Sequence, residues 1–450
     1  MREKIKLTLN KISPAWRSSM IVFLAGRILY TIWSIIILYF FPTVVNNATV
    51  YGKPVLLAFD MKMEKGYVYS RDVDGNVLSF KYFAPGQITD TASHSIWSLE
   101  QGAAIRGKYA GHPLAETDYP VQNFLGMQPH SVLPLSIWQR YDTNWYLKIA
   151  QAGYAANDGS MAFLPLYPLL IRLLGSILGD DLLAALLISN IALFFGLYFL
   201  FNLTSELMDQ PSAKRTLAYF VIFPTSFFLF AAYTEALFFL WVVFAFHAAR
   251  KDHWVLAGFL GALAALTRMQ GVLLFIPLTI IWYRNEWKER PNLLRGLPLL
   301  LIPVAFLSFQ IYTGRNYATS LESHWLARTS TPWENFQLAI RSFLDASGNL
   351  LTFFNLIVAA GFLGMCIPVW KRLPLEFSLF TILVLVVPLF RTNEGEPLVS
   401  YGRYALAAFP VFMILGNWGK KAWVNRLVIY LGFPLALYFS ARFLMWSWVG

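Results

Sequence analysis

The chain has 450 residues, of which 57% are hydrophobic and only 14% are charged. A soluble domain carries about 25% charged residues, so the composition excludes an ordinary soluble protein and indicates an all-α polytopic membrane protein, because its apolar runs do not alternate as in a membrane barrel. The formal net charge of +11 requires no nucleic acid, since basic residues on the cytoplasmic side of a membrane protein give the same excess.

The first predicted spanning helix runs from about Ser19 to Phe41 and follows a basic tail. The next roughly 120 residues contain no spanning run. Further apolar runs begin near Leu182, Leu217, Ala236, Val255, Val272, Gly296, Leu350, Leu375, Tyr404 and Leu427. Residues 162–178 are ambiguous, because they are apolar enough to insert but contain Pro165 and Pro168, which would break the first helical turns.

The distribution of Lys and Arg decides whether residues 162–178 span the membrane. If they do not, about 18 basic residues lie inside and about 6 lie outside, as the positive-inside rule requires; if they do, the bias reverses. We therefore predict about eleven spanning helices in the cell membrane, with the N-terminus cytoplasmic and residues 162–178 forming a juxtamembrane or re-entrant helix. The polar clusters then lie on the extracytoplasmic face, and the inner loops are short basic connectors.

The long first loop carries strand signals. Residues 67–82 read as two strands joined at Asp-Gly-Asn, which predicts a small β-containing extracytoplasmic insertion. Asp72 and Asp74 have the spacing of a metal motif for nucleotide sugars, but the turn is the preferred interpretation because no βαβ pattern surrounds them. The predicted domains are 1–41, a basic tail and first helix; 42–135, the insertion; 136–180, a juxtamembrane catalytic loop; and 181–450, a helix bundle.

Asp142 is the acidic residue of an amphipathic stretch that is rich in Trp and Tyr, including Tyr141 and Trp145. Such aromatic residues suit the membrane interface, so one interpretation is an interfacial helix with a solvated carboxylate. The other is a general base in a water-accessible cleft at the level of the membrane. Both interpretations remain open from the residues alone.

Ionisable residues also lie at the boundaries of the apolar runs. Glu235 and Arg268, the latter near Gln270, fit either a structural ion pair or a polar cavity, because charge at that depth is costly. A second group, Arg391, Glu394, Glu396 and Arg403, fits either a solvated loop or an anion site. The chain has no P-loop, no dinucleotide fingerprint and no Cys/His cluster, so no cofactor is expected and a metal is not indicated.

Four stretches together resemble the family of the second mannosyltransferase of GPI-anchor synthesis and its prokaryotic relatives. They are residues 140–154 (RYDTNWYLKIAQAGY) with 162–172 (AFLPLYPLLIR); 223–228 (FPTSFF) with 233–238 (YTEALF); 258–271 (GFLGALAALTRMQG); and 400–404 (SYGRY) with Phe409-Pro410. The resemblance covers roughly residues 138–412. Two departures from the family pattern are Tyr141, where the family usually has Trp, and the insertion before it.

The resemblance implies a GT-C glycosyltransferase fold and a polyprenyl-phosphate sugar as donor. It implies that Asp142, as general base, acts on a glycan or glycolipid acceptor with inversion at the anomeric carbon. An arginine, with Arg403 favoured over Arg268, would stabilise the departing lipid phosphate, and Tyr141, Trp145, Trp325, Glu235, Gln270 and Arg391 complete the candidate substrate-binding residues. The alternative is a non-catalytic transporter or flippase of lipid-linked sugars, although no duplicated half supports it.

Overall fold

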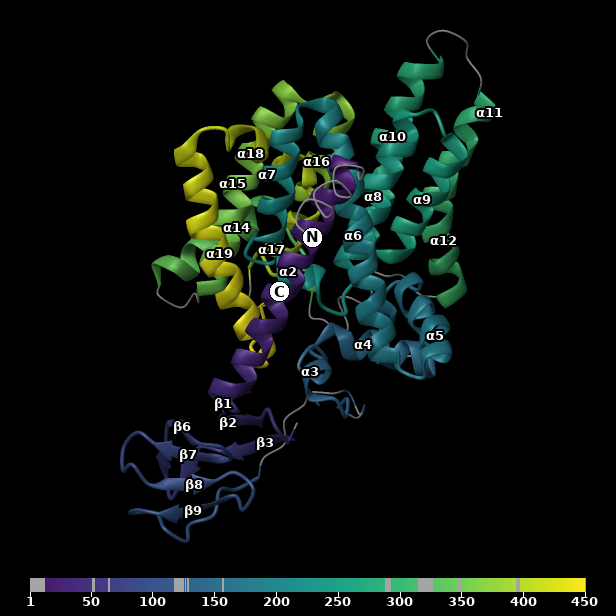
Figure 1. Cartoon of the computed structure of the whole chain (residues 1–450). Helices are drawn as coiled ribbons and strands as arrows, with labels where there is room; N and C mark the ends of the chain where they lie inside the picture. Colours follow the sequence, from purple (N-terminus) through teal and green to yellow (C-terminus); the bar gives the residue numbers. More distant parts are fainter. Residues whose placement is uncertain are drawn as a thin grey trace, which may run out of the picture. The chain divides into compact units, whose positions relative to one another are not determined.

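The computed structural model describes residues 13–50, 53–63, 65–116, 125, 127, 129–155, 158–287, 293–314, 327–345, 350–393 and 397–449. It is mostly helical and divides into two compact units (Figure 1). The first unit contains Met1–Tyr30, Trp145–Ser440 and Val449–Gly450, and the second contains Thr31–Asn144 and Ala441–Trp448.

The helices have the following bounds: α2 Pro14–Phe40, α3 Leu133–Ser136, α4 Asp142–Ala152, α5 Leu166–Leu178, α6 Asp181–Leu207, α7 Gln210–Val221, α8 Glu235–Arg250, α9 Trp254–Thr267, α10 Phe275–Trp282, α11 Leu293–Gly296, α12 Leu301–Thr313, α14 Pro332–Leu344, α15 Leu350–Arg372, α16 Leu375–Val386, α17 Tyr401–Ala405, α18 Phe409–Trp418 and α19 Ala422–Leu444. A short pair of strands, β10 Ala327–Thr329 and β11 Arg391–Asn393, lies among them.

Within the described residues, five helical stretches are long and apolar enough to cross a membrane: Pro14–Phe40, Asp181–Leu207, Leu293–Thr313, Leu350–Arg372 and Ala422–Leu444. Several shorter apolar helices accompany them. This helix content indicates a multi-pass membrane protein. Helix α5 has 13 residues, fewer than the about 20 that a spanning helix requires.

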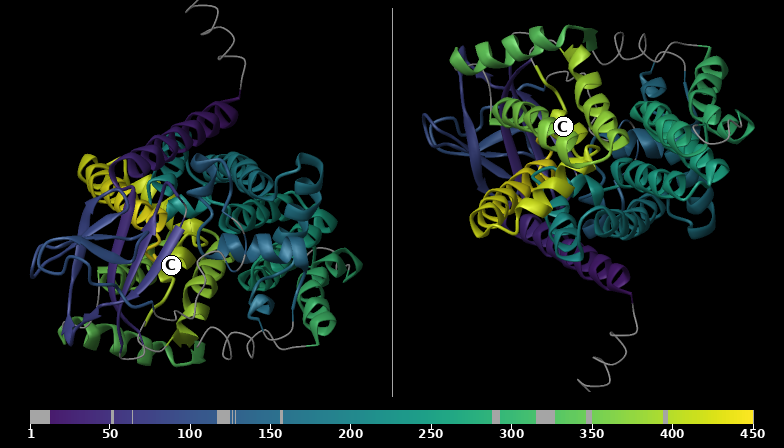
Figure 2. Two further views of the ribbon diagram at one scale, coloured as in Figure 1. Left: turned by 90° about the horizontal axis from the view of Figure 1, so that it is seen from below. Right: turned by 90° about the horizontal axis from the view of Figure 1, so that it is seen from above.

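Small residues on α6 allow it to pack closely against the next helices. Ala185, Ser189, Ala192 and Gly196 are buried along α6, which packs against α8. A Cβ atom at Gly196 would lie 2.7 Å from the Phe239 ring, so glycine permits this close approach of the two helices. Helix α8 in turn packs against α9, and α9 packs against α12, so these helices lie side by side (Figures 1 and 2).

The apolar run near Leu217 is not one continuous helix, contrary to the prediction. Helix α7 ends at Val221, where Phe223-Pro224 follows, and the chain makes only a 3₁₀ turn before α8. Proline removes a backbone donor and stops the helix. Two half-buried side chains bind the carbonyl group of Phe230 in this irregular segment: Arg27 Nη1 donates to its oxygen at 3.2 Å and Asn190 Nδ2 at 3.1 Å. Irregular backbone inside a membrane protein requires such partners.

The predicted inner connectors also contain buried ion pairs, which the sequence interpretation missed. Glu376, at the start of α16, is fully buried and accepts hydrogen bonds from Arg284 Nη1 at 3.2 Å and Nη2 at 3.1 Å. Arg250 Nη1 lies 3.6 Å from the same carboxylate, and its Nη2 lies 2.6 Å from Glu206 Oε1. A buried carboxylate needs such partners, so these ends of α6, α8 and α16 and the π-helical turn Tyr283–Trp287 are fastened together.

The second unit contains the β-rich insertion. Its strands are β1 Thr43–Val50, β2 Lys53–Asp60, β3 Lys65–Ser70, β4 Asp72–Val73, β5 Asn76–Val77, β6 Phe80–Ala84, β7 Gln87–Asp90, β8 Ile96–Ser98 and β9 Ala103–Arg106. The turn at Asp74-Gly75 is confirmed, and both residues have positive φ, 52° and 78°, as a type I′ hairpin requires. The predicted pairing is wrong beyond this turn, because β3 pairs with β2 and β6 pairs with β7.

Side-chain and loop contacts connect the three-stranded sheet β1-β2-β3 of the insertion to its four-stranded sheet β6-β7-β8-β9. The side-chain amide of Asn47 on β1 bonds to the backbone of β6 as a neighbouring strand would. Its Nδ2 donates to the Phe80 carbonyl and its Oδ1 accepts from the Phe80 N–H, both at 2.8 Å. On the other side, bridges from Pro113 to Ala103 and from Glu116 to Tyr69 connect β9 to β3. Buried residues such as Trp97, Phe80 and Ile88 fill the interior.

Candidate active site

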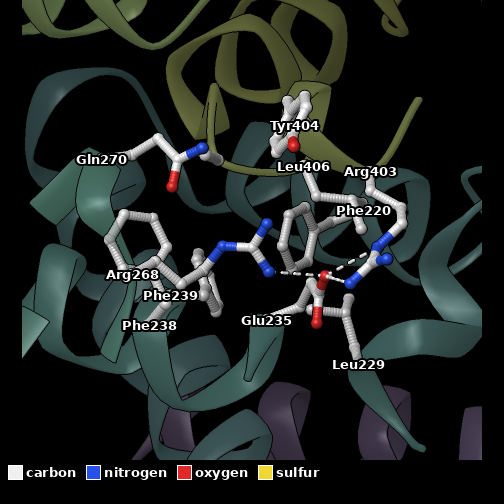
Figure 3. A pocket seen from close by; sticks show the side chains of 11 residues that line it. Phe220, Leu229, Glu235, Phe238, Phe239, Arg268, Gln270, Arg403, Tyr404 and Leu406 are labelled. Atoms are coloured by element: carbon white, nitrogen blue, oxygen red, sulfur yellow. Dashed lines mark hydrogen bonds and ion pairs between the residues drawn. The ribbon is translucent and has the colours of Figure 1, made fainter. Parts of the chain in front are cut away.

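A buried charged cluster forms where α8, α9 and α17 meet in the first unit (Figure 3). Glu235 Oε1 accepts a hydrogen bond from Arg268 Nη1 at 2.6 Å. The same oxygen accepts from Arg403 Nε at 3.0 Å and from Arg403 Nη2 at 2.8 Å. Arg268 and Arg403 therefore bind the same oxygen atom of Glu235. The three residues are far apart in sequence and come from three of the motifs described above.

Local backbone features place Glu235 and Arg268. Glu235 is the first residue of α8, where a carboxylate is stabilised by the positive end of the helix dipole. Arg268 follows α9 in extended conformation and precedes the 3₁₀ helix Met269–Leu274. A Cβ atom at Gly271 would lie 2.2 Å from the Ala264 backbone, so only glycine lets the chain turn back against α9 at this point.

Aromatic rings hold the guanidinium group of Arg403. Its Cζ lies 4.5 Å from the centre of the Phe228 ring and 5.0 Å from that of Tyr233. Only 7% of the Arg403 side chain is exposed. Cation–π contacts and the ion pair with Glu235 together stabilise a charge that would be costly to bury alone.

Arg268 is more accessible than Arg403 and uses fewer of its donors on Glu235. Its Nη1 binds both Glu235 and Thr234 Oγ1, the latter at 3.1 Å. Its Nη2 points away from Glu235 (Figure 3). Among the described residues, the Nε and Nη2 atoms of Arg268 have no hydrogen-bond partner. Arg268 therefore has N–H groups that Glu235 and Thr234 do not use; the sequence analysis named Arg268 as a candidate substrate-binding residue but favoured Arg403 for the phosphate.

The cluster carries an excess of positive charge. Two guanidinium groups face one carboxylate, which leaves a formal charge of +1 in a buried environment. Glu235 Oε2 is buried and lacks a hydrogen bond within the described part of the chain. Such a site favours an anion that is held by directed N–H donors, and the guanidinium group matches the geometry of both carboxylate and phosphate.

Gln270 and Tyr404 lie on the side of Arg268 that is remote from Glu235 (Figure 3). The free volume here is about 10 Å³, which holds about one water molecule. The pocket is otherwise apolar, and the remaining lining residues are Phe220, Leu229, Phe238, Phe239, Leu406 and Ala407. A few polar groups therefore face an otherwise apolar lining around a space of the size of a water molecule.

Asp142 belongs to the second unit, where it is half-buried and begins α4. The residue before it, Tyr141, has a positive φ of 48°, a conformation that residues with a Cβ atom rarely adopt. Its ring packs against Trp446 at 5.3 Å and Trp448 at 5.0 Å between ring centres. The predicted substrate-binding residue Tyr141 is thus also a packing residue that fixes the backbone beside Asp142.

Arg140 is a buried structural residue to which sequence reasoning assigned no role. It is fully buried, and its Nε donates to the Leu444 carbonyl oxygen at 3.0 Å while its Nη1 donates to that of Ser136 at 2.9 Å. Its guanidinium also lies 4.7 Å from the Trp446 ring. In the sequence, the feature that could have indicated this role is the position of Arg140 directly beside an aromatic stretch. Arg140 joins the loop before Asp142 to the C-terminal segment of the same unit.

Trp145 lies in the first unit and stacks on Phe163, with ring centres 5.6 Å apart. Lys148 lies 5.1 Å from its ring centre and forms an ion pair with Asp158 at 3.1 Å. Burial alone would raise the pKa of Asp158, but hydrogen bonds from Ser160 and the Lys148 ammonium outweigh it and hold this pKa below its usual range. Asp158 therefore remains ionised at neutral pH and fixes Lys148 beside Trp145.

The predicted charged loop separates into two places. Arg391 lies in β11 opposite Thr329 and does not line the pocket, whereas Arg403 lies in α17 and binds Glu235. Trp325, Glu394 and Glu396 lie outside the described residues. Within the described residues, no group of three or more His, Cys, Asp or Glu side chains is arranged to hold a metal ion.

Residues 130–324 match the family model described as mannosyltransferase (PIG-V). Over these residues the chain is similar to this family. The matched segment contains Asp142, Glu235, Arg268 and Gln270, whereas Arg403 lies beyond it. No curated protein matches the chain. The family match and the apolar helices together support a membrane glycosyltransferase.

Proposed function

We propose that this relative of the mannosyltransferase (PIG-V) family is a GT-C enzyme that transfers a hexose, by family mannose, from a polyprenyl-phosphate donor. The acceptor is a lipid-linked or cell-surface glycan on the extracytoplasmic face. The observation that carries the proposal is the buried, positively charged cluster of Glu235, Arg268 and Arg403. It suits the phosphate of a lipid donor, which reaches a membrane enzyme from the bilayer.

Asp142, Arg268 and Arg403 each have a role in the proposed inverting transfer. The acceptor hydroxyl oxygen bonds to the anomeric carbon while the bond from that carbon to the phosphate oxygen breaks, and the electron pair leaves with the lipid phosphate. The acceptor proton passes to the Asp142 carboxylate, which acts as general base. Arg268 donates directly to the phosphate, and Arg403 supplies the second positive charge. The lipid-phosphate sugar is a substrate, and the proposal invokes no cofactor.

The proposal places these residues outside the cell, with the N-terminus in the cytoplasm, because basic residues concentrate in the loops on the opposite side. We expect a cysteine introduced at the exposed residue Gln337 to react with an impermeant thiol reagent in intact cells. One at the exposed residue Lys420 should react only after the membrane is opened. Both variants use a Cys366→Ala background, since Cys366 is the only native cysteine. Labelling of position 420 in intact cells would contradict this topology.

A transport function is the rival, and product analysis separates the two. The purified protein in detergent or nanodiscs should convert radiolabelled polyprenyl-phosphate mannose, mixed with membrane lipid extract, into free polyprenyl phosphate and an equal amount of mannosylated product. A transporter moves the donor between leaflets but leaves it intact. Recovery of unchanged donor, together with its translocation in liposomes, would replace the enzyme proposal with the transporter.

A further inference from the structure

The backbone N–H and C=O groups of Gly402, directly before Arg403, each form a hydrogen bond with a buried side chain. Asn355 Oδ1 on α15 accepts a hydrogen bond from the Gly402 N–H at 3.0 Å. Thr225 Oγ1, in the irregular segment after α7, donates to the Gly402 carbonyl oxygen at 2.8 Å. Thr225 is fully buried and Asn355 is 3% exposed. The first N–H groups of a helix lack intrahelical partners, and Asn355 satisfies one of them.

The absence of a side chain at Gly402 permits this double contact. A Cβ atom there would lie 2.6 Å from Phe354 Cε1, 3.1 Å from Thr225 Cγ2 and 3.3 Å from Asn355 Oδ1. The first distance is shorter than real carbon contacts allow, so a larger residue would push the backbone away from Thr225 and Asn355. Glycine is required here for close approach of the backbone rather than for a positive φ.

The short helix that contains Arg403 depends on tertiary contacts for its position, among them the hydrogen bond from the Tyr401 hydroxyl to the Leu385 carbonyl at 2.8 Å. Helix α17 has only five residues, which is too short to be stable without tertiary contacts. Leu398 and Ser400, just before it, have positive φ values of 55° and 61°. Residues with a Cβ atom adopt this conformation only when surrounding contacts hold it. The contacts of Gly402 with Thr225 and Asn355 therefore fix the backbone directly before Arg403, while the Phe228 and Tyr233 rings contact its guanidinium group.

We propose that Thr225 and Asn355 are positioning residues for the donor phosphate, because they hold Gly402 and thereby set the guanidinium group of Arg403 against Glu235 and Arg268. The inference rests on the proposed function of this cluster. It gives a physical role to two motifs: FPTSFF supplies the hydroxyl group, and SYGRY supplies the glycine and the arginine. Neither Thr225 nor Asn355 lines the pocket, so each acts through Arg403.

The test compares isosteric variants. Thr225→Val removes the hydroxyl and leaves the buried Gly402 carbonyl without this donor, and Asn355→Leu removes the opposite contact. Each should lower kcat/KM for the donor roughly 5- to 50-fold while the acceptor KM stays within twofold, since one buried partner is lost. Thr225→Ser should restore most of the activity. Thr204→Val is the matched control: Thr204 is equally buried, but its hydroxyl binds only the Leu200 carbonyl of its own helix.

A double-mutant cycle with Arg403→Lys separates positioning from general destabilisation. If Thr225 acts through Arg403, Thr225→Val should have little further effect on donor kinetics in the Arg403→Lys background. Equal effects in both backgrounds, or an effect no larger than that of Thr204→Val, would overturn the positioning role. Unchanged donor kinetics in both Arg268→Ala and Arg403→Lys would instead overturn the phosphate site itself, so the two failures are distinguishable.

Discussion

Asp142→Asn should lower the rate of sugar transfer by about 10²–10⁴-fold, while the protein folds and binds the lipid donor with near-native affinity. An acceptor hydroxyl is a poor nucleophile at neutral pH, and the amide keeps the shape of the carboxylate but cannot accept its proton. Asp142 begins α4, and asparagine is also tolerated at a helix start, so stability should change little. Initial rates with saturating donor, together with a donor-binding measurement on the same preparation, check this result.

Asp142→Glu should also be poor, because one extra methylene displaces the base by roughly 1 Å or more. Asp74→Asn is the matched control: it makes the same chemical change in the second unit, and asparagine tolerates the positive φ of that turn. It should leave activity unaltered. If Asp142 only anchors an interfacial helix, asparagine will be accepted at 142 and any loss will follow unfolding. Transfer within a few-fold of wild type by folded Asp142→Asn would make Glu235 the next candidate base.

Arg268→Ala should weaken use of the donor by about one to two decades, because a charge-assisted hydrogen bond to phosphate contributes roughly 1.5–3 kcal/mol. The acceptor KM should stay unchanged. Arg268→Lys should recover only part of the loss, since an ammonium group cannot form the planar bidentate contact. Kinetics with the donor varied at fixed acceptor, and then the reverse, give the two constants separately.

Arg403→Ala should act in the same direction for a different reason. Without Arg403, one guanidinium group faces one carboxylate, so the excess positive charge disappears and Glu235 binds Arg268 alone. Arg403→Lys retains the charge and should be milder. Arg215→Ala serves as a control, because Arg215 is a partly buried arginine that donates to the Gly416 carbonyl and does not line the pocket. Donor constants that stay unchanged in Arg268→Ala and Arg403→Ala would transfer the phosphate role to Arg391.

The sequence by itself determined the class of protein and several local features. Long apolar runs with few charges specify a helical membrane protein, because only satisfied backbones cross a bilayer. The Asp-Gly pair at 74–75 specifies its turn, because few residues adopt positive φ at both central positions. The family resemblance also depended on local residue order, and the match over residues 130–324 confirms it for that part of the chain.

Only the tertiary structure decided which distant residues share a site. Glu235 and Arg403 are 168 residues apart in sequence, and no periodicity indicates that their side chains meet. Strands β3 and β6 likewise pair with β2 and β7, which lie outside residues 67–82, so these residues alone suggested the wrong strand pairs. The run near Leu217 breaks where Arg27 and Asn190 supply partners for its backbone. Each outcome follows from contacts between segments that are remote in sequence, whereas propensity and hydropathy describe only neighbours along the chain.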